Sequence, residues 1–232
     1  MTKTVLVTGV SSGIGLEQAR LFLDKGYRVY GVDRASKPDL TGNFTFIKQD
    51  ISKDVSLVFE KLPSIDILCN TAGVLDAYQP LLEIGMDEFE QVFATNVFAA
   101  AKLCKYYVKE MQKQRSGIII NMCSIASFIA GGGGAAYTAS KHALAGLTRQ
   151  LALDYAADGI QVFGIAPGAV KTGMTASDFE PGGLSDWVAE ETPIKRWIDP
   201  IEVAELTLFL ASGRAFGMQG EILKIDGGWS LK

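Results

Sequence analysis

The chain contains little histidine, little cysteine and no excess of positive charge. Its 232 residues include one His, which excludes a metal site built from several imidazoles, and we predict no metal site. With 22 Lys plus Arg against 26 Asp plus Glu, the formal net charge is −4, which argues against nucleic acid as a partner. The three cysteines, Cys69, Cys104 and Cys123, lie in apolar segments and form no CxxC pair. We therefore expect buried free thiols in a reducing compartment.

A long, purely apolar run is also missing. Residues 116–140 carry no charge, but Asn121, Ser124 and four glycines at 131–134 interrupt them, which is typical of a buried strand followed by a loop and not of a membrane span. Strand-like sequence begins directly after Met1, Thr2 and Lys3, so no signal peptide is recognised. We expect a cytoplasmic protein that has no membrane partner.

Hydrophobic residues make up 48% of the chain and charged residues 21%, which is a globular composition. Runs rich in β-branched residues recur and are separated mostly by helical patterns, as expected for a parallel sheet covered on both faces. These runs are residues 4–7, 28–32, 44–48, 65–69, 118–121, 161–165 and 221–225. We predict an α/β fold, a single doubly wound Rossmann domain over residues 1–232 with a parallel seven-stranded sheet. A closed α/β barrel is the alternative at this length.

Two connections in this predicted sheet are distinctive. Between Asp33 and Phe44 there are ten residues, including Pro38 and Gly42, which leaves too little chain for a full crossover helix. Residues 87–113 instead carry apolar side chains at helical spacing and predict one long helix.

Glycine is abundant, and its positions near the N-terminus predict a dinucleotide site. The first strand leads into a turn with Gly9, Gly13 and Gly15, which also contains Ser11, Ser12 and Ile14, and then into a helix. Such a turn brings backbone amides close to a pyrophosphate at the positive end of the helix. Asp33 follows at the end of the second strand, where a carboxylate binds both ribose hydroxyls and repels a 2′-phosphate. This favours NAD(H), although the adjacent Arg34 leaves NADP(H) open.

A second group of residues predicts proton-transfer chemistry. Tyr137 and Lys141 are four residues apart and share one face of a helix, Ser124 lies 13 residues before the tyrosine, and Asn96 lies on the preceding helix. A free tyrosine has a pKa of about 10, too high for an efficient base at neutral pH. We expect the ammonium of Lys141 and an oxidised nicotinamide to lower the pKa of Tyr137.

These motifs resemble the short-chain dehydrogenase/reductase family through nearly the whole chain. Asn70-Thr71-Ala72-Gly73 is similar to the family's Asn-Asn-Ala-Gly, with Thr71 in place of the second Asn. Further matches are Asp50 followed by Ile51, assigned by resemblance to the adenine, and Pro167, Gly168, Val170 and Thr172, assigned to the nicotinamide carboxamide. From the residues alone, Asp50 is equally compatible with capping a helix that begins near Ser52.

The resemblance implies interconversion of a ketone and a secondary alcohol with NAD or NADP. Tyr137 would exchange a proton with the substrate oxygen, Ser124 would hydrogen-bond that oxygen, Lys141 would also hold the nicotinamide ribose, and Asn96 would support a water relay. Residues 173–197 would form a substrate lid, whose apolar side chains suggest a partly hydrophobic substrate. The resemblance also implies a homodimer or homotetramer that pairs through residues 96–113 and 137–156, with Trp229 at a subunit boundary.

Two other functions remain open at this point. The first is a 3-oxoacyl-[acyl-carrier-protein] reductase, because a basic stripe could meet an acidic carrier, although a solvated helix face explains the stripe as well. The stripe consists of Lys102, Lys105, Lys109, Lys113 and Arg115. Asp33 weighs against this reductase, as does Asp158, where such enzymes often carry a basic residue. The second is a catalytically silent dinucleotide sensor, because a fold does not fix a function.

Overall fold

Seven parallel strands form one sheet in the order β3-β2-β1-β4-β5-β6-β7. The computed structural model describes residues 2–231, so the predicted domain ends, Met1 and Lys232, lie outside the described residues. The strands are β1 Thr4–Thr8, β2 Arg28–Asp33, β3 Phe44–Lys48, β4 Ile67–Asn70, β5 Gly117–Met122, β6 Ile160–Pro167 and β7 Ile222–Ile225. The predicted doubly wound α/β fold is confirmed, and the closed barrel is excluded because the sheet has two edges, β3 and β7.

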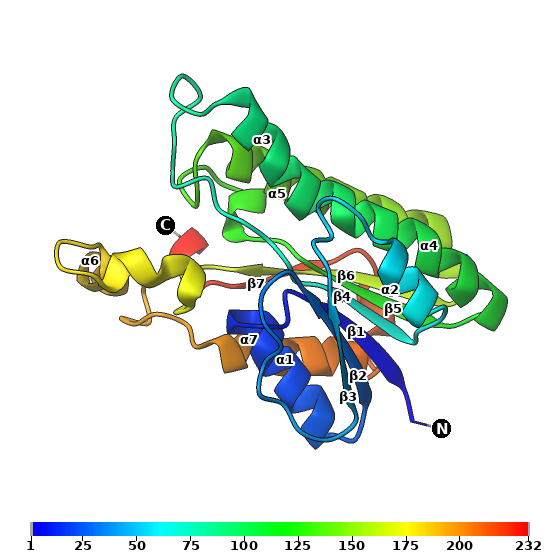
Figure 1. Cartoon of the computed structure of the whole chain (residues 1–232). Helices are drawn as coiled ribbons and strands as arrows, with labels where there is room; N and C mark the ends of the chain where they lie inside the picture. Colours follow the sequence, from blue (N-terminus) through cyan, green and yellow to red (C-terminus); the bar gives the residue numbers. More distant parts are fainter. Residues whose placement is uncertain (1, 232) are drawn as a thin grey trace.

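Helices cover both faces of this sheet (Figure 1). Val5 and Val7 of β1 point to the face that is covered by α1 and α7, whereas Leu6 points to the opposite face, where α4 packs. All of these side chains are fully buried, which explains why the strands read as apolar runs. The helices are α1 Gly13–Asp24, α2 Ser56–Lys61, α3 Met86–Phe93, α4 Ala99–Gln114, α5 Ala135–Tyr155, α6 Ser185–Glu191 and α7 Pro200–Ala211.

The connection between β2 and β3 contains no helix, as its length and its proline predicted. Residues 34–43 cross as an extended loop, and Leu40 packs against the core beside α1. The two strands still pair in parallel from Val29 opposite Phe44 to Asp33 opposite Lys48.

The long helix predicted over residues 87–113 is confirmed, but it is not a regular α-helix throughout. α3 ends at Phe93, a π-helical segment occupies Ala94–Phe98, and only then does α4 begin. The wide turn contains Asn96, whose buried side chain bonds to the backbone of Val74 outside the helix. Such π-bulges frequently mark functional sites.

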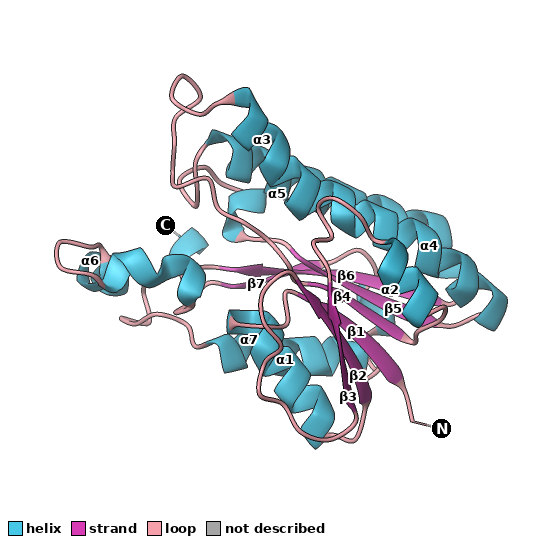
Figure 2. Cartoon of the chain, in the orientation of Figure 1, coloured by secondary structure: helices cyan, strands magenta, loops and turns pink. Residues whose placement is uncertain are grey.

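The carboxyl ends of the strands point to one edge of the sheet, where the longer loops gather (Figure 2). Ligands bind at this edge in open α/β sheets. Three short helical segments follow strands at this edge: Ile125–Ser127 after β5, Gly173–Phe179 after β6 and Trp229–Leu231 after β7. Two others, Ala156–Asp158 and Phe216–Met218, precede β6 and β7.

Candidate functional site

A cleft of about 580 Å³ opens at the carboxyl edge of the sheet. It collects most of the residues predicted from sequence: Gly9, Ser12, Gly13, Ile14, Gly15, Asp33, Arg34, Asp50, Ile51, Ala72, Gly73, Ser124, Tyr137, Lys141, Pro167, Gly168, Val170 and Thr172. Ser11, Asn70 and Asn96 do not line it. Ser11 and Asn70 instead hold neighbouring segments, because Ser11 donates to Asp33 and to the Ser36 carbonyl while Asn70 donates to Asn121 on β5.

The glycine turn has the geometry that a pyrophosphate requires. Gly9 and Gly13 adopt left-handed φ angles of 72° and 53°. A side chain on Gly9 would stand 2.9 Å from the Cα of Ala72, and one on Gly15 would collide with the carbonyl oxygen of Gly9. Helix α1 begins directly after the turn, and Ser12 at its N-cap makes no side-chain cap bond. The turn and the first amides of α1 therefore fit a dinucleotide phosphate.

Asp33 ends β2 at one end of the cleft. Its Oδ2 accepts a hydrogen bond from the Ser11 amide (3.0 Å), and its Oδ1 accepts one from the Ala35 amide (2.9 Å). Asp33 and the exposed Arg34 both line the cleft. Two backbone amides thus fix the carboxylate at the wall of the cleft.

The alternative that Asp50 caps a helix is wrong, because α2 begins only at Ser56. Asp50 closes a turn instead: its Oδ1 accepts bonds from the hydroxyl (2.6 Å) and the amide (3.1 Å) of Ser52. The hydroxyl bond is the main reason why the pKa of Asp50 lies below its usual value.

Thr71, the departure from the family motif, forms its own set of braces. Its hydroxyl donates to Oε1 of the buried Gln18 (2.6 Å), and the Gln18 amide donates to the hydroxyl of Thr207 on α7 (2.8 Å). The Thr8 hydroxyl accepts from the amides of Thr71 and Ala72 (both 2.9 Å). The end of β4 is therefore tied to β1, α1 and α7.

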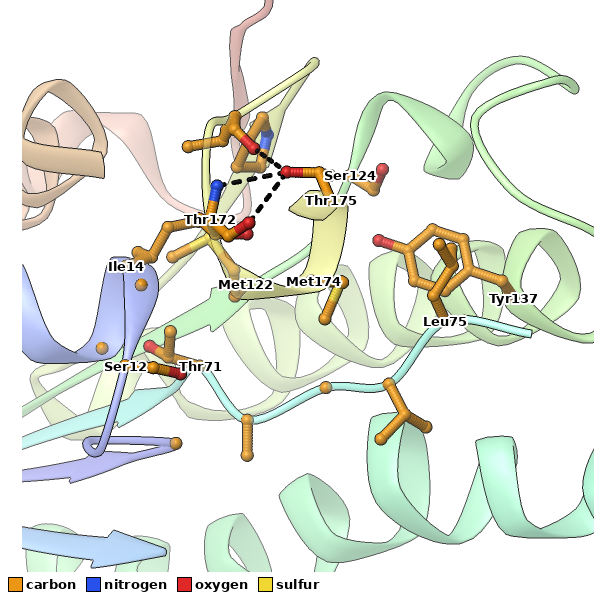
Figure 3. Close-up of a pocket in the computed structure, with 18 of the residues that line it drawn as sticks. Ser12, Ile14, Thr71, Leu75, Met122, Ser124, Tyr137, Thr172, Met174 and Thr175 are labelled. Atoms are coloured by element: carbon orange, nitrogen blue, oxygen red, sulfur yellow. Dashed lines mark hydrogen bonds between the residues drawn. The ribbon is translucent and has the colours of Figure 1, made fainter. Parts of the chain in front are cut away.

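Tyr137 and Ser124 face the cleft from the opposite side to Ser12, Ile14 and Thr71 (Figure 3). Ser124 follows β5, which ends at Met122. It caps the short helical segment Ile125–Ser127, and its hydroxyl accepts from the Ala126 amide. Burial raises the pKa of Tyr137 to about 12, and a hydrogen bond from Ser124 opposes that rise.

Lys141 is buried one helical turn after Tyr137. Its ammonium donates to the Met122 carbonyl (2.7 Å) and lies 5.5 Å from the centre of the tyrosine ring. Burial lowers the pKa of Lys141 to about 8. In the protein alone, burial therefore moves the two pKa values apart, and the lowering of the Tyr137 pKa expected from Lys141 together with an oxidised nicotinamide stays a prediction.

Asn96 lies behind the cleft and joins three segments. Its amide group accepts from the Val74 amide (2.9 Å) and donates to the Val74 carbonyl (3.0 Å) and to the Ser140 hydroxyl (3.0 Å). Ser140 in turn donates to the Tyr137 carbonyl (2.7 Å). The segment after β4 is thereby held against the helix that carries Tyr137.

The far end of the cleft is formed by the predicted lid. Thr172 caps the segment Gly173–Phe179, and the Thr175 hydroxyl bonds to the Thr172 amide and carbonyl and to the Val170 carbonyl (Figure 3). Apolar and aromatic side chains line this end: Leu75, Tyr78, Met174, Leu184, Trp187, Val188, Trp197 and Trp229. Trp229 meets Trp187 edge to face at 6.1 Å, so it packs against the lid of its own chain.

Sequence reasoning missed two residues here, Asp76 and Tyr78. Asp76 is fully buried and accepts hydrogen bonds from the Gly134 and Tyr137 amides (both 2.8 Å). Tyr78 lines the cleft and is half-exposed. Both residues lie in an irregular loop, where the sequence has no helical or strand periodicity. The one sequence signal for Asp76 is that an acidic residue follows shortly after the Asn-Thr-Ala-Gly segment.

Other sequence features lie away from this cleft. Arg115 of the basic stripe pairs with Asp158 (2.9 Å), and Lys113 pairs with Glu110 (2.7 Å). Cys69, Cys104 and Cys123 are buried and free. Within residues 2–231, no cluster of three or more His, Cys, Asp or Glu side chains could hold a metal ion, and no helix is long and apolar enough to cross a membrane.

Comparison with known proteins agrees with this fold. The family model described as enoyl-(acyl carrier protein) reductase matches residues 9–230. Short-chain dehydrogenase reductase 3c of Arabidopsis thaliana is 35% identical over 247 residues, covering 99% of this chain and 95% of the relative. A 4-hydroxyisoleucine dehydrogenase complexed with NADH has a TM-score of 0.93 at 29% identity, and ElxO with NADP bound has 0.89 at 28%; in both cases all of each chain is covered.

The chain belongs to the short-chain dehydrogenase/reductase family. It is therefore an oxidoreductase that acts on CH–OH groups, and its cofactor is a nicotinamide dinucleotide.

Proposed function

We propose that the protein is an NAD(H)-preferring oxidoreductase that interconverts a ketone and a secondary alcohol. The observation that carries the proposal is that Tyr137, Ser124 and Lys141 line the same cleft as the glycine turn, with the Lys141 ammonium 5.5 Å from the centre of the tyrosine ring. A nucleotide-binding turn alone would also suit a sensor, whereas a phenol paired with a hydroxyl and a buried ammonium suits proton transfer.

The dinucleotide, when bound, supplies the hydride donor or acceptor and, when oxidised, a positive charge. Tyr137 takes the proton of an alcohol during oxidation and returns it to the carbonyl oxygen during reduction. Ser124 holds the same oxygen, because its hydroxyl lies near enough to the Tyr137 phenol to oppose the rise in its pKa. Lys141 holds the nicotinamide ribose with its ammonium. Asn96 keeps α5 in place and, from the π-helical turn, supports the path of the proton to solvent.

Asp33 supports the preference for NAD(H). Two backbone amides fix its carboxylate at the ribose end of the cleft, where it can accept from both ribose hydroxyls and repels a 2′-phosphate. Arg34 beside it is the residue that would favour NADP(H).

The substrate we propose is a small, partly hydrophobic carbonyl compound or alcohol without a carboxylate. The substrate end of the cleft is lined by aromatic and aliphatic side chains, with residues 173–197 as its lid. Among the lid residues that line the cleft, the charged one is Asp178, whose field already raises the pKa of Tyr78 after the larger effect of burial. A substrate carboxylate would be repelled there.

A carrier-protein-linked substrate has less support. The ion pair between Arg115 and Asp158 neutralises one end of the basic stripe, and Lys113 is engaged by Glu110. We also propose a cytoplasmic dimer or tetramer that pairs through α4 and α5, because α5 leaves Leu153 77% exposed.

The test is NADH oxidation over a panel of ketones, in which neutral aliphatic and aromatic ketones are matched with carboxylate-bearing analogues and carrier-linked 3-oxoacyl groups. We expect turnover of neutral ketones with NADH and a loss of about a hundredfold or more in kcat for Tyr137→Phe, because the proton donor is removed. NADH binding should stay within about twofold, since the phenol hydroxyl is one contact among many.

Three results would contradict parts of the proposal. Turnover of Tyr137→Phe at the wild-type rate would remove the assigned chemistry. Higher kcat/KM with NADPH would overturn the cofactor preference. Binding of NADH without turnover of any ketone, carrier-linked ones included, would identify a sensor instead.

A further inference from the structure

The turn 76–79 after β4 contacts the start of α5 through backbone amides. The Gly134 amide donates to Oδ1 of Asp76 (2.8 Å), the Ala135 amide donates to the Gln79 carbonyl (3.1 Å), and the Tyr137 amide donates to Oδ2 of Asp76 (2.8 Å). Three of the amides that a helix start leaves without an intrahelical partner are thus satisfied by one turn. One of them belongs to Tyr137 itself.

Asp76 is an unusual residue to find in this place. It is 0% exposed, and among the described residues its carboxylate forms no salt bridge, so its partners are backbone amides at the positive end of α5. A buried carboxylate is costly unless it is hydrogen-bonded, which makes its position sharply defined. A small displacement of Asp76 would therefore displace the first turn of α5.

The turn is also strained in a way that reaches the substrate. Ala77 and Tyr78, which are not glycines, adopt left-handed φ angles of 50° and 60°. Such conformations persist only where the surrounding structure imposes them, and they cluster at functional sites. Here the bonds of Asp76 and Gln79 on either side impose them, and Tyr78 is thereby directed to the cleft wall.

We propose that Asp76 is a positioning residue, which fixes the Tyr137 hydroxyl relative to the substrate and couples it to the Tyr78 wall through the turn 76–79. The proposal rests on the proposed function, since it assigns how the proton-transferring group is held. Asp76 touches neither substrate nor cofactor, because it is absent from the residues that line the cleft.

The same carboxylate acts on Tyr137 through its charge. Tyr137 is faced by Ser124 and Cys123 from the end of β5, by Tyr78 and Asp76 from the turn, and by Lys141 from its own helix. Burial is the largest cause of the raised pKa of Tyr137, and the negative charge of Asp76 adds to it. Removal of that charge should lower the pKa of Tyr137.

The experiment compares Asp76→Asn with Asp199→Asn, measured with the best ketone of the panel and its alcohol. Asp199 is a matched control, because it caps α7 outside the cleft and its replacement by Asn keeps a good N-cap. We expect Asp76→Asn to lower kcat by about tenfold to a hundredfold, since small misplacements of a reacting group have effects of this size. The KM for NADH should change by less than about twofold, because Asp76 lies outside the proposed cofactor contacts.

The pH profile separates positioning from a general loss of stability. In alcohol oxidation, kcat/KM rises as Tyr137 loses its proton, so the rising, acid-side limb of the pH profile of Asp76→Asn should move to lower pH while that of Asp199→Asn stays in place. If Asp76→Asn does not fold, Asp76→Ser, which keeps a cap oxygen without the charge, carries the same comparison.

An Asp76 variant with wild-type kcat and an unmoved pH limb would overturn the inference. The inference would also be overturned if Asp199→Asn lost kcat to the same extent. The same holds if Asp76→Asn lowered Tm without shifting the rising limb of the pH profile. A wild-type protein that turns over no ketone would instead overturn the proposed function, so the two failures are distinguishable.

Discussion

At the scale of single residues, burial sets the proton affinities of the candidate site. Desolvation raises the pKa of Tyr137 to about 12 and lowers that of Lys141 to about 8, which moves the two values apart in the direction that keeps both groups neutral. A nearby positive charge reverses this tendency for the tyrosine. Proton transfer by Tyr137 should therefore depend on the oxidised cofactor being bound.

Asp33 provides a residue-scale prediction about cofactor choice. Asp33→Ala removes the acceptor for ribose hydroxyls and leaves Arg34, which can pair with a 2′-phosphate. We expect the ratio of kcat/KM with NADH to kcat/KM with NADPH to fall about tenfold or more. The reason is that the repulsion between the Asp33 carboxylate and a 2′-phosphate, which costs several kcal/mol, is removed, and about 1.4 kcal/mol corresponds to a factor of ten.

The double variant Asp33→Ala, Arg34→Ala is the control for this prediction. Without the guanidinium, most of the gain with NADPH should disappear. A single variant that keeps the wild-type ratio would show that Asp33 does not select the cofactor.

At the scale of elements, the buried bonds of Gln18 connect β4, α1 and α7. Gln18→Leu keeps the approximate volume but leaves the Thr71 hydroxyl without its acceptor, at a cost of about 1–3 kcal/mol. For a chain of this length, Tm should fall by roughly 2–4 °C per kcal/mol, measured calorimetrically without cofactor at fixed protein concentration.

Gln114→Leu is the matched control for this substitution, because Gln114 is exposed at the end of α4. Its effect on stability should stay within about 0.5 kcal/mol. Equal Tm values for Gln18→Leu and wild type would show that the hydroxyl finds another partner.

The elements also show what a sequence can predict and where it stops. Apolar β-branched runs predicted the strands, and the ten residues after Asp33 predicted a crossover without a helix, because both are local properties of the chain. The π-helical turn at Asn96 depends on bonds to Val74, 22 positions away, while the apolar spacing still fits one regular helix. The role of Asp76 depends on the amides of Gly134 and Tyr137, which lie 58 and 61 positions away. Nothing in the sequence around Asp76 indicates that these amides are its partners.

At the scale of the whole molecule, the sheet places two kinds of chemistry at one edge. The glycine turn follows β1, Asp33 ends β2, and Ser124 follows β5, so one cleft joins residues separated by more than a hundred positions. Each parallel strand ends at the same edge, which is why a doubly wound fold assembles such a site. The proposed pairing between subunits uses the outer faces of α4 and α5.

Leu153 tests this pairing directly. It lies on α5 and is 77% exposed, although apolar side chains of this size gain by burial. Leu153→Arg would place a charge in the proposed interface, where it has to be desolvated, and we expect a fall in mass measured by light scattering at micromolar concentration. Leu82→Arg is the control, since Leu82 is 100% exposed in a loop outside both helices and its replacement should leave the mass unchanged. A monomeric wild-type protein would show that there is no such pairing surface. An assembly that only Leu82→Arg disrupts would place the pairing surface elsewhere.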